Sequence, residues 1–178
     1  MPMDPTMHDE AGAGAALEFL GDGADIGPQI AALVLKTTLF SGFSQEEAGR
    51  LARYLQLFRS APGVVILREG DPGDYMMLLF EGKVDVLKGD HQKRQKLIGA
   101  VLPGETFGEM SLVDGEPRFA TCVTVGTSLY ALLSRDTFAR LISDDARLGA
   151  KLLVQLLEMV SRRLRETSEA LVDYLKVS

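Results

Sequence analysis

The segment from Gly104 to Thr121 holds the residues whose types and spacing are best suited to chemistry. It joins two apolar runs, and its stretch Glu109–Val113 predicts a short helical turn. Gly108 stands at the start of that turn, where the absence of a side chain lets a ligand approach the backbone. The free N–H groups at the start of a helical turn attract anions. We therefore expect an anion site here.

Two charged residues of the segment indicate which anion would bind. Arg118 has a planar guanidinium that can hold phosphate oxygens as a fork. Glu109 would repel a phosphate, so it must serve another group, such as a sugar hydroxyl that donates a hydrogen bond to it. An arginine for phosphate and an acid for a hydroxyl together describe a nucleotide site. On these two residues alone a surface ion pair, worth ~0–1 kcal/mol, stays an alternative.

The composition limits the other classes of function. The chain has 178 residues, 46% hydrophobic and 25% charged, which is typical of one globular domain with or without an appendage. Its net charge of -6 argues against general binding to nucleic acid, which requires basic patches. No apolar run reaches the ~18 residues of a membrane span. A single cysteine and no signal peptide make the cytoplasm the expected compartment.

Enzymatic chemistry has little support in this sequence. The two histidines, His8 and His91, lie far apart, which argues against a histidine-rich metal site. We find neither a nucleophile–base pair that contains histidine nor a Walker-type phosphate loop. Cys122 lies in an apolar run and is expected to be an inert core residue. We expect no catalytic residue, no metal and no cofactor.

The apolar pattern predicts a mainly β protein with flanking helices. Glycine accounts for 18 of the 178 residues, a larger share than its average of ~7% in proteins, and this indicates many tight turns. We expect a flexible leader (1–27), helices (28–63), a β region (64–134, with the segment 104–121) and helices again (135–178). Pro28 should begin one helix, and Ser44 should cap another that continues past Phe58. Strands are expected at the short apolar runs Val64–Leu67, Met76–Phe80, Val84–Leu87, Leu97–Leu102, Ala120–Val125 and Leu129–Leu133.

A long helix is predicted from near Asp145 towards Lys176. Its apolar residues alternate four and three apart in a heptad seam, which suits either packing on its own domain or a dimer. A second apolar stripe runs beside the seam, so the helix can pack on its own domain and on a second copy, and we favour the dimer. The seam is Leu153, Leu157, Val160, Leu164, Thr167, Leu171 and Tyr174, and the stripe is Leu152, Leu156 and Met159.

The stretches Phe107–Leu112 and Pro117–Thr121 resemble the phosphate-binding cassette of cyclic-nucleotide-binding domains. That family includes the catabolite activator protein and the regulatory domains of cyclic-nucleotide-dependent kinases and channels. Three further stretches are similar to the family's early strand–turn motif, its Gly-x-Val strand and its dimer helix: Arg68–Asp74, Glu81–Val86 and Arg162–Glu169. The resemblance covers about residues 36 to 175, with the motifs in the family's order.

The resemblance implies a β-jelly-roll with flanking helices and a cyclic nucleotide bound inside the roll. By match to the cassette, Glu109 would accept a hydrogen bond from the ribose 2′-OH, and Gly108 would allow close approach to the sugar. Arg118 would pair with the cyclic phosphate. Backbone N–H groups near Ser111 and Phe119 would complete the phosphate site.

The remaining site residues also follow from the resemblance. Phe107 and Met110 belong to the cassette, and Val86 and Ile98 match apolar positions that wall the base. Thr167 and its neighbour Ser168 match the polar pair that touches the adenine from the long helix. Because Thr167 lies on the heptad seam, the alternative is that it only sets the register of paired helices.

Phe119 departs from the family pattern. The family usually has a small residue or a threonine directly after the cassette arginine, and domains that prefer cGMP tend to have the threonine. Phe119 has no hydroxyl for the guanine amino group, so we expect cAMP rather than cGMP. Its ring would either stack on the base or fill part of the pocket. A filled pocket would make the chain a ligand-independent scaffold or protein-interaction module, which is the alternative function.

The expected function is therefore a cyclic-nucleotide receptor. Ligand binding would shift the conformation of the long helix, or of a dimer formed through it, for an unidentified downstream protein. Transcription factors of the family have a helix-turn-helix domain after the long helix, and this chain ends at Ser178, about where that domain would begin. We expect no specific DNA binding by this chain and no membrane partner.

Overall fold

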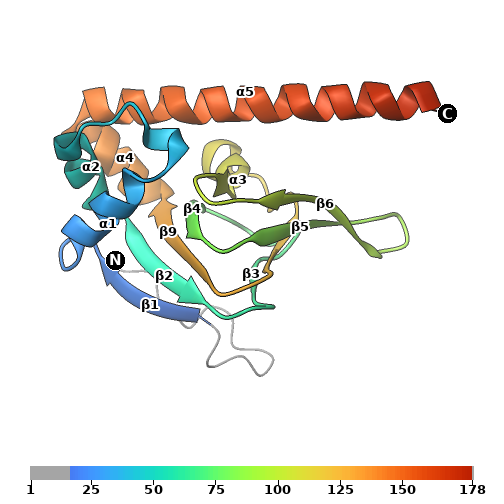
Figure 1. Ribbon diagram of the computed structural model, residues 1–178, viewed down its shortest axis with the longest axis horizontal. Helices are drawn as coiled ribbons and strands as arrows, with labels where there is room; N and C mark the ends of the chain where they lie inside the picture. Colours follow the sequence, from blue (N-terminus) through green and yellow to red (C-terminus); the bar gives the residue numbers. More distant parts are fainter. Residues whose placement is uncertain (1–16, 178) are drawn as a thin grey trace. The chain divides into compact units, whose positions relative to one another are not determined.

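The computed structural model describes residues 17–177, and side chains as far as residue 173. The chain forms two compact units that divide after Phe138 (Figure 1). The first unit contains all the described strands and most of the helices. The second contains the end of helix α4 (Arg135–Asp144) and helix α5 (Ala146–Val177).

The strands of the first unit form two antiparallel sheets. One sheet has the order β1 (Leu17–Asp22), β2 (Gln56–Ser60), β9 (Ser128–Ser134), β4 (Tyr75–Glu81) and β7 (Thr106–Phe107). The other has the order β3 (Val65–Leu67), β8 (Thr121–Thr124), β5 (Val84–Gly89) and β6 (Gln95–Val101). Most neighbours are not consecutive in the chain, so long crossovers bring distant segments together. The six predicted strands are confirmed.

The central strands β4 and β9 are buried on both faces. This explains why their sequences are continuous apolar runs rather than alternating ones. Alternate residues such as Leu79 and Tyr130 enter a core cluster that also takes Val84 from β5 and Cys122 from β8. Cys122 is buried, as predicted. The core therefore joins residues from both sheets and supports the segment that follows β7.

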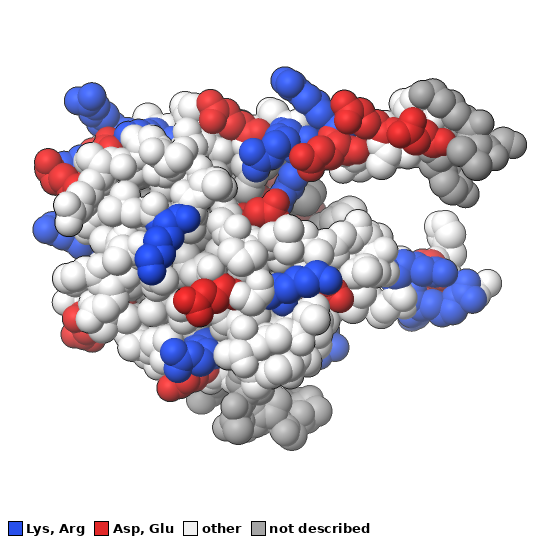
Figure 2. Space-filling model, viewed as in Figure 1, with Lys and Arg blue, Asp and Glu red and all other residues white. Residues whose placement is uncertain are grey.

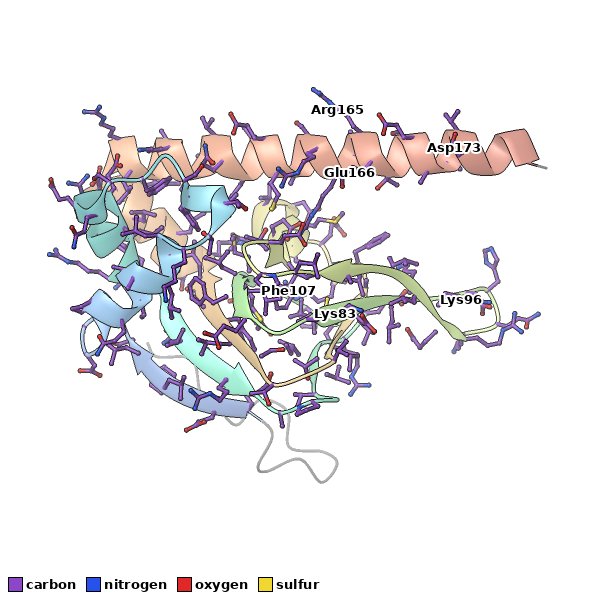
Figure 3. The ribbon with its side chains drawn as sticks, viewed as in Figure 1. Lys83, Lys96, Phe107, Arg165, Glu166 and Asp173 are labelled. Atoms are coloured by element: carbon purple, nitrogen blue, oxygen red, sulfur yellow. The ribbon has the colours of Figure 1, made fainter. Side chains whose placement is uncertain are left out.

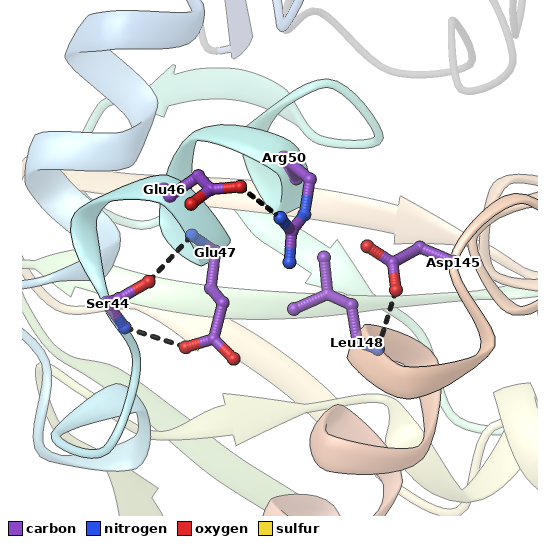
Figure 4. A network of polar contacts seen from close by, with 6 residues as sticks. All are labelled: Ser44, Glu46, Glu47, Arg50, Asp145 and Leu148. Atoms are coloured by element: carbon purple, nitrogen blue, oxygen red, sulfur yellow. Dashed lines mark hydrogen bonds and ion pairs between the residues drawn. The ribbon is translucent and has the colours of Figure 1, made fainter.

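The helices of the first unit begin where the sequence predicts. Helix α1 (Gly27–Val34) has Pro28 in its first turn, and a 3-10 turn (Thr38–Phe40) follows it. Helix α2 (Gln45–Ala52) begins with a complete capping box (Figure 4). Ser44 Oγ accepts a hydrogen bond from the Glu47 N–H at 3.1 Å, and Glu47 Oε2 accepts one from the Ser44 N–H at 2.8 Å. This reciprocal pair satisfies two N–H groups that helix formation leaves without partners.

The structure differs from the sequence prediction in three places. Residues Leu17–Asp22, placed in the flexible leader, form β1, and residues 1–16 of that leader lie outside the described residues. The helix expected to pass Phe58 ends at Ala52, and the following residues form β2. Strand β7 was not predicted at all. The apolar residues of β2 fit a helical spacing, but pairing with β1 and β9 decides their conformation.

Helix α5 confirms the predicted long helix. Asp145 Oδ1 accepts a hydrogen bond from the Leu148 N–H at 3.0 Å, which caps the first turn (Figure 4). A Cβ on Gly149 would lie 2.8 Å from Ile142 Cγ1, so the glycine lets α5 begin close to the end of α4. None of the described helices, α5 included, is both long and apolar enough to span a bilayer.

Tyr130 links the stability of the fold to alkaline pH. Burial raises the pKa of Tyr130 to about 12, whereas an exposed tyrosine has a pKa of about 10. The folded chain keeps a proton that the unfolded chain loses, so this stabilisation is complete below about pH 10 and is lost as the pH rises towards about 12. We expect Tyr130→Phe to unfold at a higher pH than the wild type when both are followed by circular dichroism. Identical alkaline unfolding curves would contradict this assignment.

Candidate functional site

The predicted cassette is built around a short helix between two left-handed glycines. Helix α3 (Glu109–Asp114) is preceded by Gly108 and followed by Gly115, each with φ 77° and ψ 4°. Glycine adopts this conformation without a steric penalty. A Cβ on Gly108 would also lie 2.8 Å from Arg118 Nη1 and 3.1 Å from Leu67 Cδ1. Gly108 therefore serves both the turn and the close approach of the arginine.

The guanidinium of Arg118 is buried, with 3% of the residue exposed. Nη1 donates hydrogen bonds to the Tyr75 carbonyl at 2.7 Å and to the Gly108 carbonyl at 2.9 Å. Nη2 is buried and has no hydrogen-bond partner among the described residues. A buried cation with an unsatisfied donor is costly unless an anion joins it. A phosphate oxygen that accepted a hydrogen bond from Nη2 would therefore satisfy this donor.

The structure removes the alternative in which Arg118 and Glu109 form a surface ion pair. Both residues are buried, with 3% and 8% exposed, so neither is a surface side chain. Thr106 Oγ1 donates to Glu109 Oε2 at a long 3.5 Å, and Glu109 is the first residue of α3, where a carboxylate suits the helix dipole.

The turn before β4 encloses the arginine from its other side. A Cβ on Gly73 would overlap the Arg118 guanidinium, so only glycine fits there. The Arg118 N–H donates to the Asp71 carbonyl at 2.8 Å, and the Gly70 N–H donates to the Arg118 carbonyl at 2.9 Å. Sequence reasoning matched this turn to a family motif but gave it no role. Gly73 was the signal that a close approach occurs here, whereas Gly70 has open space around it and a φ of 85°.

Tyr75 is a site residue that sequence reasoning missed. Arg118 Cζ lies 4.2 Å from the centroid of the Tyr75 ring, in addition to the hydrogen bond to the Tyr75 carbonyl. Burial raises the pKa of Tyr75, although the nearby Arg118 cation partly offsets this, so the phenol stays neutral. A neutral aromatic face beside the guanidinium stabilises its charge without neutralising it.

The other cassette residues lie in different surroundings. Phe107, labelled in Figure 3, is a core residue. Its ring meets that of Tyr130 edge-on, with centroids 6.2 Å apart. Met110 is exposed, whereas Ser111 is buried and its carbonyl accepts a hydrogen bond from Arg135 Nη2 at 2.6 Å. Arg135 is the first residue of α4. The cassette helix is therefore connected through Ser111 to the helix that follows the sheets.

The two predicted base-wall residues lie on neighbouring strands of the four-stranded sheet. Val86 pairs with Cys122 of β8, directly after the cassette, and with Gly99 of β6. Its side chain packs against the core cluster. Ile98 is the extra residue where the register of β6 shifts, and it is about half exposed. A role in base binding stays a prediction for both.

Thr167 and Ser168 are exposed residues of α5 in the second unit. Their hydroxyls donate hydrogen bonds at 2.8 Å to the carbonyls of Arg163 and Leu164, one turn earlier. Such bonds satisfy the hydroxyls within the helix. Contact of these residues with a base stays a prediction.

Phe119 is about half exposed and is fixed by Lys88 of β5. Lys88 Nζ donates to the Phe119 carbonyl at 2.6 Å and lies 4.2 Å from the centroid of its ring. The same ammonium pairs with Glu69 Oε1 at 2.8 Å. Nothing in the sequence indicated this contact, because the three residues are separated along the chain and meet only through the pairing of β5 with β8.

Positive charge also gathers at the tip of the β5–β6 hairpin (Figure 2), where Lys93, Arg94 and Lys96 are exposed. Arg94 Nη2 pairs with Asp90 Oδ2 at 2.9 Å. Hydrogen bonds from the Arg94 backbone and side chain hold the pKa of Asp90 below its usual value. These charges are solvated, unlike Arg118, and so are weaker candidates for holding a single small anion.

The fold and the cassette together define a ligand-binding domain of the jelly-roll type. The family model for the cyclic nucleotide-binding domain matches residues 57–145, which is half of the chain. The chain belongs to the cyclic nucleotide-binding domain family. The resemblance stated from the cassette residues is thereby confirmed.

Solved and characterised relatives agree with this assignment. A cyclic nucleotide-binding domain from Methylobacillus flagellatus is 36% identical, with a TM-score of 0.80, and the match covers 94% of this chain and 96% of that one. This confirms the predicted jelly-roll with flanking helices.

Two families of regulators are also similar. A CRP-like cAMP-activated global transcriptional regulator of Mycobacterium tuberculosis is 27% identical over 80% of this chain and 62% of its own length. A cAMP-dependent protein kinase regulatory subunit of Dictyostelium discoideum is 33% identical over 60% of this chain and 33% of its own length. The chain thus spans about three fifths of the first relative and a third of the second.

The two left-handed glycines around α3 allow a matched test of the site. Gly108→Ala and Gly115→Ala both place a Cβ at φ 77°, a strain of ~1 kcal/mol. Only at residue 108 does the new Cβ meet buried groups closely, since at residue 115 it lies 3.3 Å from the movable end of Arg135. We expect thermal unfolding to show a larger loss of stability for Gly108→Ala. Equal losses would mean that Gly108 serves the turn alone.

Proposed function

We propose that this chain is a cAMP sensor whose ligand binds at the cassette. The observation that carries the proposal is the buried Arg118, whose Nη2 has no hydrogen-bond partner among the described residues. An anion is the group that would satisfy it, and a cyclic phosphate provides equivalent oxygens for a forked contact. The family to which the chain belongs binds cyclic nucleotides, which supports this choice of anion.

The remaining cassette residues would divide the ligand between them. Glu109, buried at the start of α3, would accept a hydrogen bond from the ribose 2′-OH. The N–H groups of Ser111 and Phe119 would add to the phosphate contacts. A cyclic mononucleotide has ~22 heavy atoms, and ~0.3–0.4 kcal/mol for each gives ~7–9 kcal/mol, or micromolar affinity. Charge-assisted hydrogen bonds to Arg118 would supply ~1.5–3 kcal/mol each.

The choice of cAMP rests on Phe119 and on the relatives. Phe119 has no hydroxyl to meet the guanine amino group, so the usual support for cGMP is missing. The two regulators compared above are described as cAMP-activated and cAMP-dependent. We infer that cAMP is bound more tightly than cGMP, and that the chain acts by binding and not by catalysis.

The output of the sensor would pass through α5. Its stripe residues Leu152, Leu156 and Met159 are buried, whereas Leu157 and Leu164 of the seam are 65% and 67% exposed. An apolar heptad seam that stays exposed in one copy suits a second copy of the chain. Ligand binding would shift the equilibrium between dimer or helix conformations in proportion to its differential affinity for them. A downstream protein would recognise the change.

A second candidate function follows from the same Phe119. Its carbonyl and ring are already fixed by Lys88, and a ring that fills the pocket would leave a ligand-independent scaffold. The scaffold and the sensor differ in one measurable property. Only the sensor binds a cyclic nucleotide with micromolar affinity.

Calorimetric titration with cAMP tests the sensor directly. We expect Arg118→Ala to weaken binding at least tenfold, because a single charge-assisted hydrogen bond is worth ~1.5–3 kcal/mol. Arg59→Ala is the control, since Arg59 is an exposed residue of β2 paired with Glu18 at 3.4 Å. Unchanged affinity in a folded Arg118→Ala protein would overturn the site, and a wild type that binds no cyclic nucleotide would favour the scaffold.

Charge reversal on α5 tests the proposed dimer. We expect Leu164→Glu to convert the dimer to a monomer, because two carboxylates would face each other across an apolar seam. Val172→Glu is the matched control: Val172 is 49% exposed on the same helix but lies outside the seam. Sedimentation velocity measures both variants. A Leu164→Glu protein that dimerises as the wild type does would place any dimer contact elsewhere.

A further inference from the structure

The ammonium group of Lys88 is held between two parts of the site. It pairs with Glu69 Oε1 at 2.8 Å and donates to the Phe119 carbonyl at 2.6 Å. It also lies 4.2 Å from the centroid of the Phe119 ring. One side chain of β5 thus fixes both the peptide and the ring of the residue that follows Arg118.

Glu69 is itself held by two hydrogen bonds, so its ion pair with Lys88 restricts the movement of the lysine. Glu69 Oε2 accepts a hydrogen bond from the Gly89 N–H at 2.9 Å, and the Glu69 N–H donates to Thr121 Oγ1 at 3.0 Å. Hydrogen bonds from Lys88 and Gly89 hold the pKa of Glu69 below its usual value, so the Glu69 carboxylate stays charged at neutral pH. The turn before β4, the end of β5 and the start of β8 are joined by this network.

The network holds the Phe119 ring in place while about half of the residue stays exposed. A cation lies over the ring, yet 52% of the residue is exposed. An exposed cation–π contact is weak by itself, but together with the hydrogen bond to the Phe119 carbonyl it fixes the orientation of the ring. A ring held rigidly beside a phosphate-binding arginine is suited to stacking on a flat aromatic group.

We propose that Phe119, held by Lys88 and Glu69, is the platform on which the base of the bound cyclic nucleotide stacks. The proposal rests on the proposed function, because it requires a nucleotide at Arg118. Stacking uses the face of a base and not its hydrogen-bonding edge, and its loss weakens binding by about tenfold or more. Since a purine offers a larger face than a pyrimidine, the platform selects purine cyclic nucleotides. Lys88 is a positioning residue that acts through the ring.

The chain has no tryptophan, so Phe119→Trp introduces one fluorophore at the platform itself. We expect cAMP to quench its fluorescence with a midpoint that equals the calorimetric Kd, because a stacked base quenches indole. We expect Phe119→Tyr to keep the wild-type affinity and Phe119→Leu, which keeps apolar volume but loses the aromatic face, to lose about tenfold. Phe119 is half exposed, so these variants should fold, which circular dichroism verifies.

The ratio of affinities for cAMP and cCMP separates stacking from a structural role. We expect this purine preference to fall in Phe119→Leu and, to a smaller extent, in Lys88→Met. Lys83→Met is the matched control, because Lys83 precedes the same strand and pairs in the same way with Asp85, at 3.0 Å. We expect the control to keep both the affinity and the ratio.

The outcomes distinguish the two proposals. If the wild type binds cAMP but Phe119→Leu keeps its affinity and its purine preference, the platform is overturned and the sensor stands. Binding by Phe119→Trp without a change in fluorescence has the same meaning. If the wild type binds neither nucleotide, the sensor is overturned and the platform with it.

Discussion

The buried guanidinium of Arg118 is the constraint on which the site depends. A cation with one unsatisfied donor is stable inside a protein only if its other contacts are strong and its charge is finally matched by an anion. Two backbone carbonyls and the Tyr75 ring supply the first part. The glycines at 73 and 108 are required because any side chain there would displace the guanidinium. A cyclic phosphate is the proposed match for the charge.

The two-sheet framework explains how such a group is held in place. Arg118 contacts carbonyls that lie 43 and 10 residues earlier in the chain, so the arginine connects β4 to the cassette. Tyr75 is the first residue of β4 and pairs with Ser134 of β9, which fixes the position of its carbonyl. The cassette helix α3 is short and is bounded by glycines, and Arg135 of α4 bonds to its Ser111 carbonyl. A rigid strand on one side and a small helix on the other is a suitable arrangement for a site that changes on binding.

Affinity, selectivity and output would depend on different parts of the molecule. Arg118 and Glu109 would hold the phosphate and the sugar, which every cyclic nucleotide shares. The Glu69–Lys88 pair and Phe119 would act on the base, which differs between ligands. The exposed seam of α5 belongs to the second unit and would carry the response to a second copy or to a downstream protein. A substitution in one part could therefore alter its property without loss of the other two.

The sequence alone predicted the features that depend on residues near one another in the chain. These are the cap at Ser44, the glycine before α3, the six apolar strands and the heptad seam. The sequence also identified Arg118 and Glu109, because the cassette is one continuous segment. It did not reveal β1 or β2, whose conformation is decided by pairing with distant strands. Nor did it reveal the Tyr75 and Lys88 contacts, because spacing along the chain has no information about distances across a sheet. Only the tertiary structure could show that Arg118 is buried with one donor unsatisfied, because burial depends on residues that lie far apart in the chain. That observation carries the proposal that the cassette binds an anion.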